Sequence, residues 1–221
     1  MSDNRRTYRA IKSALRQLYP GEPQGNLARH LDTLAAMVSG IVRSQSSQLP
    51  AIARKVPDGN KPESRVKRYS RWVKNEHIDG EVYFLPFAEP MLQGLAQNRT
   101  LVLAMDGSEV GRGCLTLMVS VIYKKRALPV AWVTGKGSKG HFPEATHVQL
   151  LTEVHALVPP ASDVVFLGDG EFDGTNLQAA LNDYEWAYVC RTAKNVQLCE
   201  GGDWFAFAEL DVPRGAYCGV P

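Results

Sequence analysis

The sequence predicts an α/β protein in which a helical region precedes a mixed β-sheet. Through residues 1–98, apolar side chains recur every three or four positions, which is the spacing of amphipathic helices. From residue 99 onward, short apolar runs alternate with turn residues, which is typical of strands and of the helices that connect them. The change of period divides the chain into three predicted parts, residues 1–98, 99–195 and 196–221.

The first part contains four predicted helices. Apolar stripes run through residues 8–18 and 27–41. Two shorter helices are expected at about residues 49–56 and 63–74, because the sequence PDGNKP between them is a strong turn signal. Two short helices joined by a turn are compatible with a helix-turn-helix.

Charge is unevenly divided along the chain, although the whole chain carries only +2. Residues 1–100 hold 16 Lys and Arg against 9 Asp and Glu, whereas residues 101–221 hold 9 against 14. A basic half joined to an acidic half suggests one part that binds a polyanion and another that carries acids or a metal. A solvated helix face remains the alternative for any one basic cluster.

The basic segment at residues 54–74 is the candidate DNA-binding surface. Val66, Tyr69 and Trp72 are expected to face the core, which leaves the basic side chains pointing outward for phosphate contacts. The candidate DNA-binding residues of this segment are Arg54, Lys55, Arg65, Lys67, Arg68, Arg71 and Lys74.

The second part begins with three apolar strands, at residues 101–106, 114–123 and 127–134. Their links are short enough for hairpins, so these strands are expected to be antiparallel neighbours. The order then becomes helix, strand, helix, strand, at about residues 144–157, 163–168, 175–183 and 185–192.

This order of elements is that of an RNase H-like fold. In such a sheet the fourth strand lies beside the first, so Asp106 and Asp169 would meet at one edge of the sheet. Two close carboxylates repel each other unless a cation lies between them. Because oxygen ligands favour Mg²⁺ or Mn²⁺, the sequence predicts a site for a divalent metal.

Three motifs point to a family. They are LAMDGSEV around Asp106, FLGDGEFDG around Asp169, and AYVCRTAKN around Arg191. With them, the chain resembles the DDE transposases of bacterial insertion sequences over most of its length. The segment from His30 to Val56, with the basic segment ending SRWVKN, resembles their helical DNA-binding region.

The resemblance implies metal-dependent DNA transposition. Members hold two metal ions with two Asp and one Glu, water cuts at the transposon end, and the released 3′-hydroxyl attacks target DNA. Asp106 and Asp169 match the first two acids, as catalytic residues and metal ligands. Arg191 matches a basic position that contacts DNA. The implied partners are transposon-end DNA, target DNA and a second copy in a synaptic complex.

The third acid of the family has no counterpart in the sequence. Relatives carry it as a Glu on a downstream helix, in a Tyr-Arg-Glu-Lys pattern, whereas residues 196–221 read as the start of a β-rich insertion with Gly turns. The resemblance therefore implies a transposase truncated before its third acid, and Glu171, Glu200 and Glu209 are the possible substitutes. The alternative is a non-catalytic fragment that only binds transposon-end DNA.

A remote alternative is a nucleotide-dependent oxidoreductase. Residues Gly135, Gly137 and Gly140 form a GxGxxG pattern after a strand. The strand is expected to be third in a meander, and HFP separates the pattern from the next helix, so a flexible basic loop is favoured. His141, His147 and His155 lack metal-binding spacing and are expected to be surface or packing residues.

The sequence also favours a cytoplasmic protein. No apolar run approaches the roughly 20 residues that span a bilayer, and no apolar stretch follows the basic start as in a secretory signal. The four cysteines form no CxxC pair, which favours reduced thiols.

Overall fold

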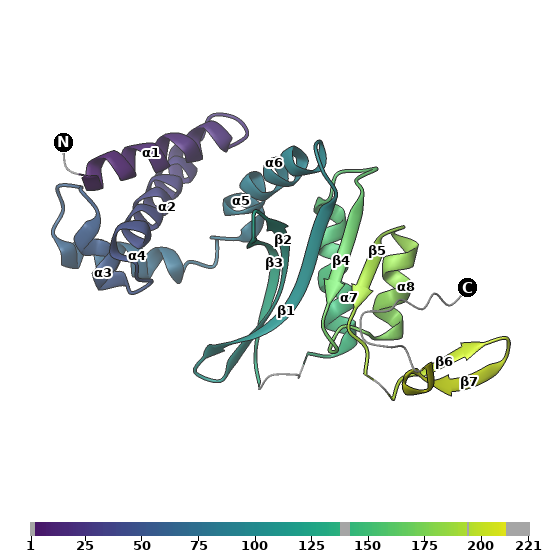
Figure 1. Ribbon diagram of the computed structural model, residues 1–221. Helices are drawn as coiled ribbons and strands as arrows, with labels where there is room; N and C mark the ends of the chain where they lie inside the picture. The colour runs from purple at the N-terminus through teal and green to yellow at the C-terminus, as the bar shows by residue number, and fades with distance from the viewer. Residues whose placement is uncertain (1–2, 138–141, 194, 211–221) are drawn as a thin grey trace. The chain divides into compact units, whose positions relative to one another are not determined.

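The computed structural model describes residues 3–137, 142–193 and 195–210 (Figure 1). The chain divides into two compact units between Gln93 and Gly94, whereas the sequence predicts a boundary at residue 98. The first unit is helical, and the second is a mixed α/β unit.

The helical unit contains the four helices predicted for it. These are α1 (Asp3–Leu18), α2 (Gly25–Ser44), α3 (Leu49–Lys55) and α4 (Pro62–Val73). Two further helices follow, α5 (Gly80–Tyr83) and α6 (Leu85–Ala96), and the division between the units falls within α6.

Helix α2 is the centre of the helical unit, because it contacts α1, α3 and α4. The core is formed by Ala36, Met37, Ile52, Ala53, Val56 and Tyr69. Small residues on α2 let α3 approach closely. A Cβ atom on Gly40 would lie only 2.8 Å from the backbone oxygen of Ile52, so this helix crossing requires glycine.

The α/β unit is built on a five-stranded mixed sheet with the order β3-β2-β1-β4-β5. The long strands β1 (Leu101–Gly111), β2 (Cys114–Tyr123) and β3 (Arg126–Lys136) are antiparallel neighbours, as predicted. The short strand β4 (Val164–Gly168) pairs in parallel with β1, and β5 (Ala187–Cys190) pairs in parallel with β4. The prediction that the fourth strand lies beside the first is therefore confirmed.

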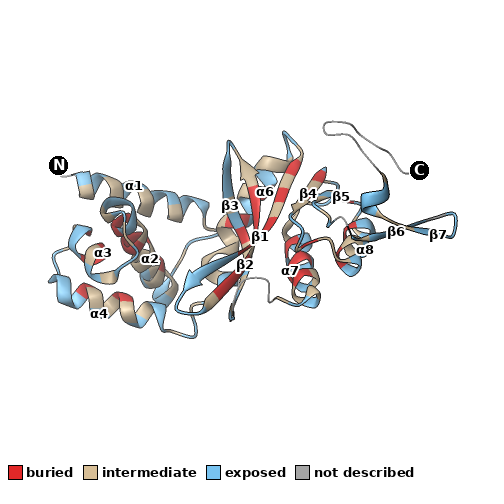
Figure 2. Ribbon diagram, turned by 60° about the horizontal axis from the view of Figure 1, so that its bottom comes forward, coloured by how far each residue is buried: buried red, intermediate tan, exposed pale blue. Residues whose placement is uncertain are grey.

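Two helices pack against this sheet. Helix α7 (Glu144–Leu157) contacts β2 and β3, and α8 (Thr175–Asp183) contacts α7 and β5. Buried residues alternate along the first half of β1, at Leu101, Leu103 and Met105 (Figure 2), because successive side chains of a strand point to opposite faces.

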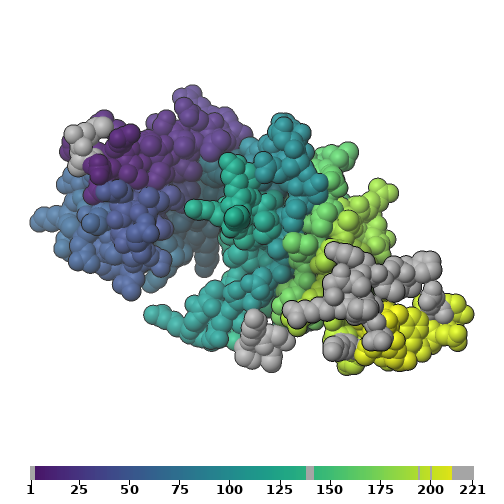
Figure 3. All heavy atoms as spheres, viewed as in Figure 1, coloured from purple at the N-terminus to yellow at the C-terminus, as the bar shows by residue number. Residues whose placement is uncertain are grey.

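The first strand is longer than predicted. It continues past Asp106 to Gly111, and residues 108–113 at its far end are all exposed. The end of this β1–β2 hairpin projects from the rest of its unit (Figure 3). The fifth strand is shorter than predicted and ends at Cys190, one residue before Arg191. Short β6 (Gln197–Glu200) and β7 (Asp203–Ala206) form a separate hairpin, followed by a 3-10 turn (Phe207–Leu210).

Replacing Gly40 with alanine is predicted to destabilise the protein by about 1–3 kcal/mol, because the new methyl group overpacks the α2–α3 crossing. Gly94 on α6 is the matched control, since a Cβ there meets nothing within 4 Å. Gly94→Ala should be neutral or stabilising by up to about 1 kcal/mol through helix propensity. Urea denaturation checks both. Equal effects of the two variants would contradict the close crossing.

Candidate functional site

The paired register of β1 and β4 brings two carboxylates to neighbouring positions. The last paired residues are Ala104 and Leu167. Asp106 and Asp169 each follow this last pair by two residues, Asp106 within β1 and Asp169 just after the end of β4. Neighbouring strands lie about 4.8 Å apart, so the two residues are on adjacent backbones. Both residues are exposed.

Asp106 belongs to the interior of a strand. It pairs with Met118 of β2, and the hydroxyl of Ser108 donates a hydrogen bond to its Oδ2 at 3.1 Å. The sequence predicts that the strand ends at this aspartate, and that prediction is wrong. The strand persists because the antiparallel hairpin with β2 continues after the parallel pairing with β4 has stopped.

Asp169 begins a tight turn directly after β4. Its Oδ1 accepts a hydrogen bond from the amide of Glu171 at 3.0 Å, and its carbonyl accepts one from the amide of Phe172 at 3.0 Å. The side chain of Phe172 is completely buried and anchors the turn. The amide of Arg191 donates to the carbonyl of Gly168 at 3.0 Å, so the residue after β5 is tied to the same turn.

Glu171 lies two residues after Asp169 in the sequence, and its carboxylate is beside Gly107. Its two oxygens lie 3.6 and 3.9 Å from the position of a Cβ atom on that glycine. Because successive strand residues face opposite sides of a sheet, this is the face opposite to that of Asp106. The structure thus places this substitute for a third acid away from the Asp106 face.

Helix α7 meets the turn from the buried side through His147. Its ring packs against Phe172, with ring centroids 5.0 Å apart, and its Nε2 has no hydrogen-bond partner among the described residues. Burial lowers the pKa of His147, and the Glu171 and Glu144 carboxylates oppose that shift without reversing it. His147 is therefore a packing residue, as expected.

The same helix fixes the start of α8 through Glu144. Its Oε1 accepts hydrogen bonds from the amides of Asn176 at 2.8 Å and Leu177 at 3.1 Å, and its Oε2 accepts from the Asn176 side chain. These bonds, the Asn176 side chain first, hold the pKa of Glu144 below its usual value. Gly174 is the N-cap residue of α8 and has no side chain to accept the first amides of the helix, so the Glu144 carboxylate accepts them instead. This capping role of Glu144 was not predicted from the sequence, since Glu144 is far from the start of α8 in the chain.

The remaining candidates for a third acid are separate from this turn. Glu209 accepts a hydrogen bond from the amide of Ala206, beside the small hairpin, and the side chain of Glu200 lies outside the described residues. Within residues 3–137, 142–193 and 195–210, no group of three His, Cys, Asp or Glu side chains is arranged to hold a metal ion. The carboxylate oxygens of Asp106 and Asp169 suit Mg²⁺, which binds through one or two carboxylates and keeps several waters.

In the helical unit, Arg65 is not at the surface. It is only 8% exposed, and its guanidinium donates to the Asp58 side chain, to the Ala53 carbonyl at 2.6 Å and to the Asp58 carbonyl. The expectation that all basic side chains of α4 point outward is therefore wrong for Arg65. Its guanidinium joins α4 to α3 and to the turn between them.

Arg68 shares the same partner and is half-buried. Its Nη2 donates to Asp58 Oδ2 at 2.9 Å, and its guanidinium lies over the ring of Tyr69. Burial on its own would raise the pKa of Asp58, but hydrogen bonds from Arg65, the Asn60 amide and Arg68 hold that pKa below its ordinary value.

The other basic candidates are exposed. On α3 and α4 these are Arg54, Lys55, Lys67 and Arg71, with Lys74 directly after α4. Arg191, in the other unit, is also exposed and lies next to the turn that carries Asp169. These side chains are available for phosphate contacts.

The glycine pattern lies in an unsuitable place for a dinucleotide. Strand β3, which contains Gly135, is an antiparallel strand at the sheet edge, whereas dinucleotide motifs follow the first parallel strand of a βαβ unit. Gly140 and His141 lie outside the described residues.

No protein-family model and no curated protein matches the chain. Among the helices that the structure describes, none is both long enough and apolar enough to cross a membrane.

Replacing Asp58 with asparagine is predicted to destabilise the protein by about 2 kcal/mol at pH 7, because the buried Arg65 charge loses its partner. A carboxyl whose pKa is lowered by folding stabilises the protein above its unfolded pKa, here 3.8, and that stabilisation is lost as the pH falls through the folded value. The difference between variant and wild type should therefore shrink below about pH 4.

Urea denaturation between pH 7 and pH 3.5 measures this difference. Glu76→Gln is the charge-matched control, because Glu76 is exposed in the same unit and should change stability by less than about 0.5 kcal/mol. A difference that stays constant with pH would contradict the ionised Asp58 bridge.

Proposed function

We propose that this chain is a DDE transposase chain, with an RNase H-like catalytic sheet and a helical region that binds transposon-end DNA. One observation carries the proposal: β1 pairs in parallel with β4, and Asp106 and Asp169 each follow the last residue pair by two positions. The sheet order β3-β2-β1-β4-β5 supports it, since this is the order expected for an RNase H-like sheet.

In this proposal Asp106 and Asp169 hold Mg²⁺ or Mn²⁺. When bound, the metal activates the attacking oxygen and stabilises the leaving oxygen of a phosphodiester. Ser108 orients the Asp106 carboxylate, and the Glu171 amide orients that of Asp169. Arg191 lies beside the same turn and offers a cation to the DNA phosphates.

The exposed bases of α3 and α4 contact DNA phosphates in this proposal. Lys67 and Arg71 are one helical turn apart on α4 and share a face. Arg65 is omitted from the contact set, because its guanidinium is buried against Asp58 and Ala53. Arg68 contributes mainly to the fold of the unit, through the same aspartate.

A second candidate function is DNA binding without cleavage. It is favoured by the position of Glu171, whose carboxylate lies on the opposite sheet face from Asp106. With two acids in place, metal binding is weaker than with three. The chain would then occupy transposon ends and leave them uncut.

The catalytic proposal predicts that the chain nicks supercoiled plasmid carrying the repeats that flank its gene, in Mn²⁺. Asp169→Ala should reduce nicking to background, because one of the two metal-binding carboxylates is lost. Asp183→Ala, which removes an exposed acid at the end of α8, is the control and should nick as well as the wild type. Binding without nicking by any of these proteins would support the second candidate instead.

The DNA-binding proposal predicts that Arg71→Ala lowers the slope of log affinity against log salt by about 0.9, since one phosphate contact is lost. Arg126→Ala removes an exposed arginine from the start of β3 and should leave the slope unchanged. Electrophoretic shifts on terminal-repeat DNA at several salt concentrations measure both. If binding is insensitive to salt, both candidate functions are excluded.

A further inference from the structure

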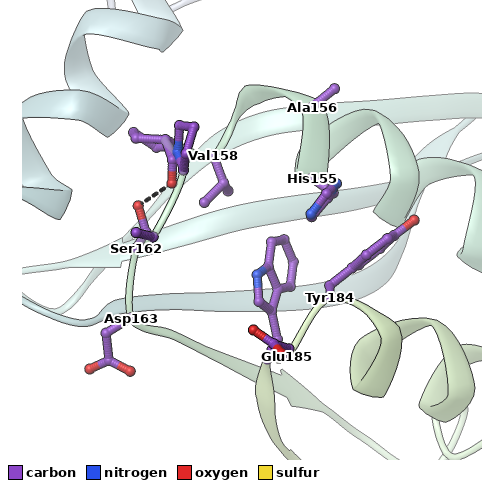
Figure 4. A pocket seen from close by; sticks show the side chains of 11 residues that line it. His155, Ala156, Val158, Ser162, Asp163, Tyr184 and Glu185 are labelled. Atoms are coloured by element: carbon purple, nitrogen blue, oxygen red, sulfur yellow. Dashed lines mark hydrogen bonds between the residues drawn. The ribbon is translucent and has the colours of Figure 1, made fainter.

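A cavity lies in the α/β unit, between the end of α7 and the end of α8. It has a volume of about 600 Å³ and is lined by residues 155–156, 158–163 and 184–186 (Figure 4). Its walls come from the turn that follows α7 and from the turn that leads into β5. Val164 begins β4 and Ala187 begins β5, so the cavity adjoins the starts of these strands, whereas Asp169 follows the end of β4.

Three aromatic rings form one wall of the cavity. The rings of His155 and Tyr184 are stacked, with centroids 3.8 Å apart and planes 13° apart, and Trp186 packs against both. The Tyr184 hydroxyl lies 3.0 Å from the Thr152 hydroxyl, which fixes the ring of Tyr184. The rings of His155 and Tyr184 therefore lie against each other at this wall (Figure 4).

Trp186 also leaves a polar group without a partner. The residue is only 6% exposed and lines the cavity, yet its indole N–H makes no hydrogen bond to any residue that the structure describes. The indole nitrogen is not among the buried polar atoms that lack a partner, so it can be reached from the cavity. Because a Trp N–H usually finds an acceptor, a ligand that brings an oxygen to this N–H would be stabilised.

The cavity is acidic. Asp163 and Glu185 both line it and are exposed, no lysine or arginine does so, and neither carboxylate forms an ion pair with a described residue. Asp163 accepts one hydrogen bond, from Thr100. The carboxylate of Glu185 therefore has free acceptor capacity beside the aromatic wall.

Glu185 occupies a position where glycine is usual. It follows α8 and has a φ of 58°, in the left-handed region, and the Trp186 amide closes the helix end on the Leu181 carbonyl. Helices commonly end with glycine at this place, because a side chain is strained there. Ala161, which lines the same cavity, also has a left-handed φ of 58°. Strain of this kind often marks functional sites.

We propose that this cavity binds an arginine side chain of a polypeptide. A guanidinium is flat, stacks on aromatic rings and presents a fork of donors to carboxylates, which matches the rings together with Asp163 and Glu185. A backbone carbonyl next to the arginine accepts the free N–H of Trp186. The basic half of a second copy of this chain and an unrelated basic protein offer the same chemistry. The inference is independent of the proposed transposase activity.

The test is an NMR titration of the full chain with N-acetyl-L-arginine amide, which carries both a guanidinium and a peptide carbonyl. The Trp186 indole signal, assigned with Trp186→Phe, should shift and saturate. Glu185→Gln should weaken binding about fivefold, the upper range for an exposed charge pair. Glu153→Gln, an exposed acid of α7 outside the cavity, is the control and should bind normally.

Glu185→Gly separates binding from folding. It should raise the melting temperature, because the backbone strain is relieved, and still weaken binding as Glu185→Gln does. The proposal is overturned if the Trp186 signal does not shift, or if Glu185→Gln binds N-acetyl-L-arginine amide as tightly as the wild type. It is also overturned if N-acetyl-L-lysine amide or N-acetyl-L-alanine amide shifts the Trp186 signal as much as the arginine probe does. Sedimentation with and without the probe shows where the bound arginine comes from. Self-association that the probe reverses indicates an arginine of a second copy of the chain. A monomer that binds the probe indicates an arginine of another polypeptide.

Discussion

The parallel pairing of β1 with β4 is the constraint on which the candidate site depends. Four residue pairs, ending at Ala104 and Leu167, fix the register of the two strands. A slip by one residue would turn the carboxylate of one strand to the opposite face. The buried residues Leu103 and Phe166, paired in the same register, hold it in place, because a slip would expose them. The positions of Asp106 and Asp169 thus follow from core packing.

The β1–β2 hairpin continues past the point where the pairing of β1 with β4 stops, so the two aspartates have different surroundings. Asp106 is held within a strand that β2 supports on one side, whereas Asp169 is held by a turn anchored on the buried Phe172. The turn itself is tied to the start of α7 through Glu144 and α8, and to the end of β5 through the Arg191 amide. Elements distant in sequence therefore fix one short acidic turn.

Local patterns predicted α1 to α4, α7, α8 and the order of the five strands of the main sheet, because each leaves a periodic or sequential signal, but they did not predict α5 or α6. The length of β1 was not predictable from its apolar run, since pairing with β2 extends it through polar residues. Arg65 looks like a surface base in sequence, and only the position of Asp58 across the α3–α4 turn shows that it is internal. Likewise, the opposite-face position of Glu171 depends on the turn conformation, which the sequence motif does not reveal.

The most direct test of the central claim is paramagnetic broadening by Mn²⁺ in NMR spectra of the full chain. The account predicts that backbone signals around Asp106 and residues 168–170 broaden first, and that Asp169→Asn weakens this effect. That outcome would establish that the two aspartates share a divalent cation, independently of any activity on DNA. Broadening centred elsewhere, or unchanged in the variant, would contradict a metal site at this edge of the sheet.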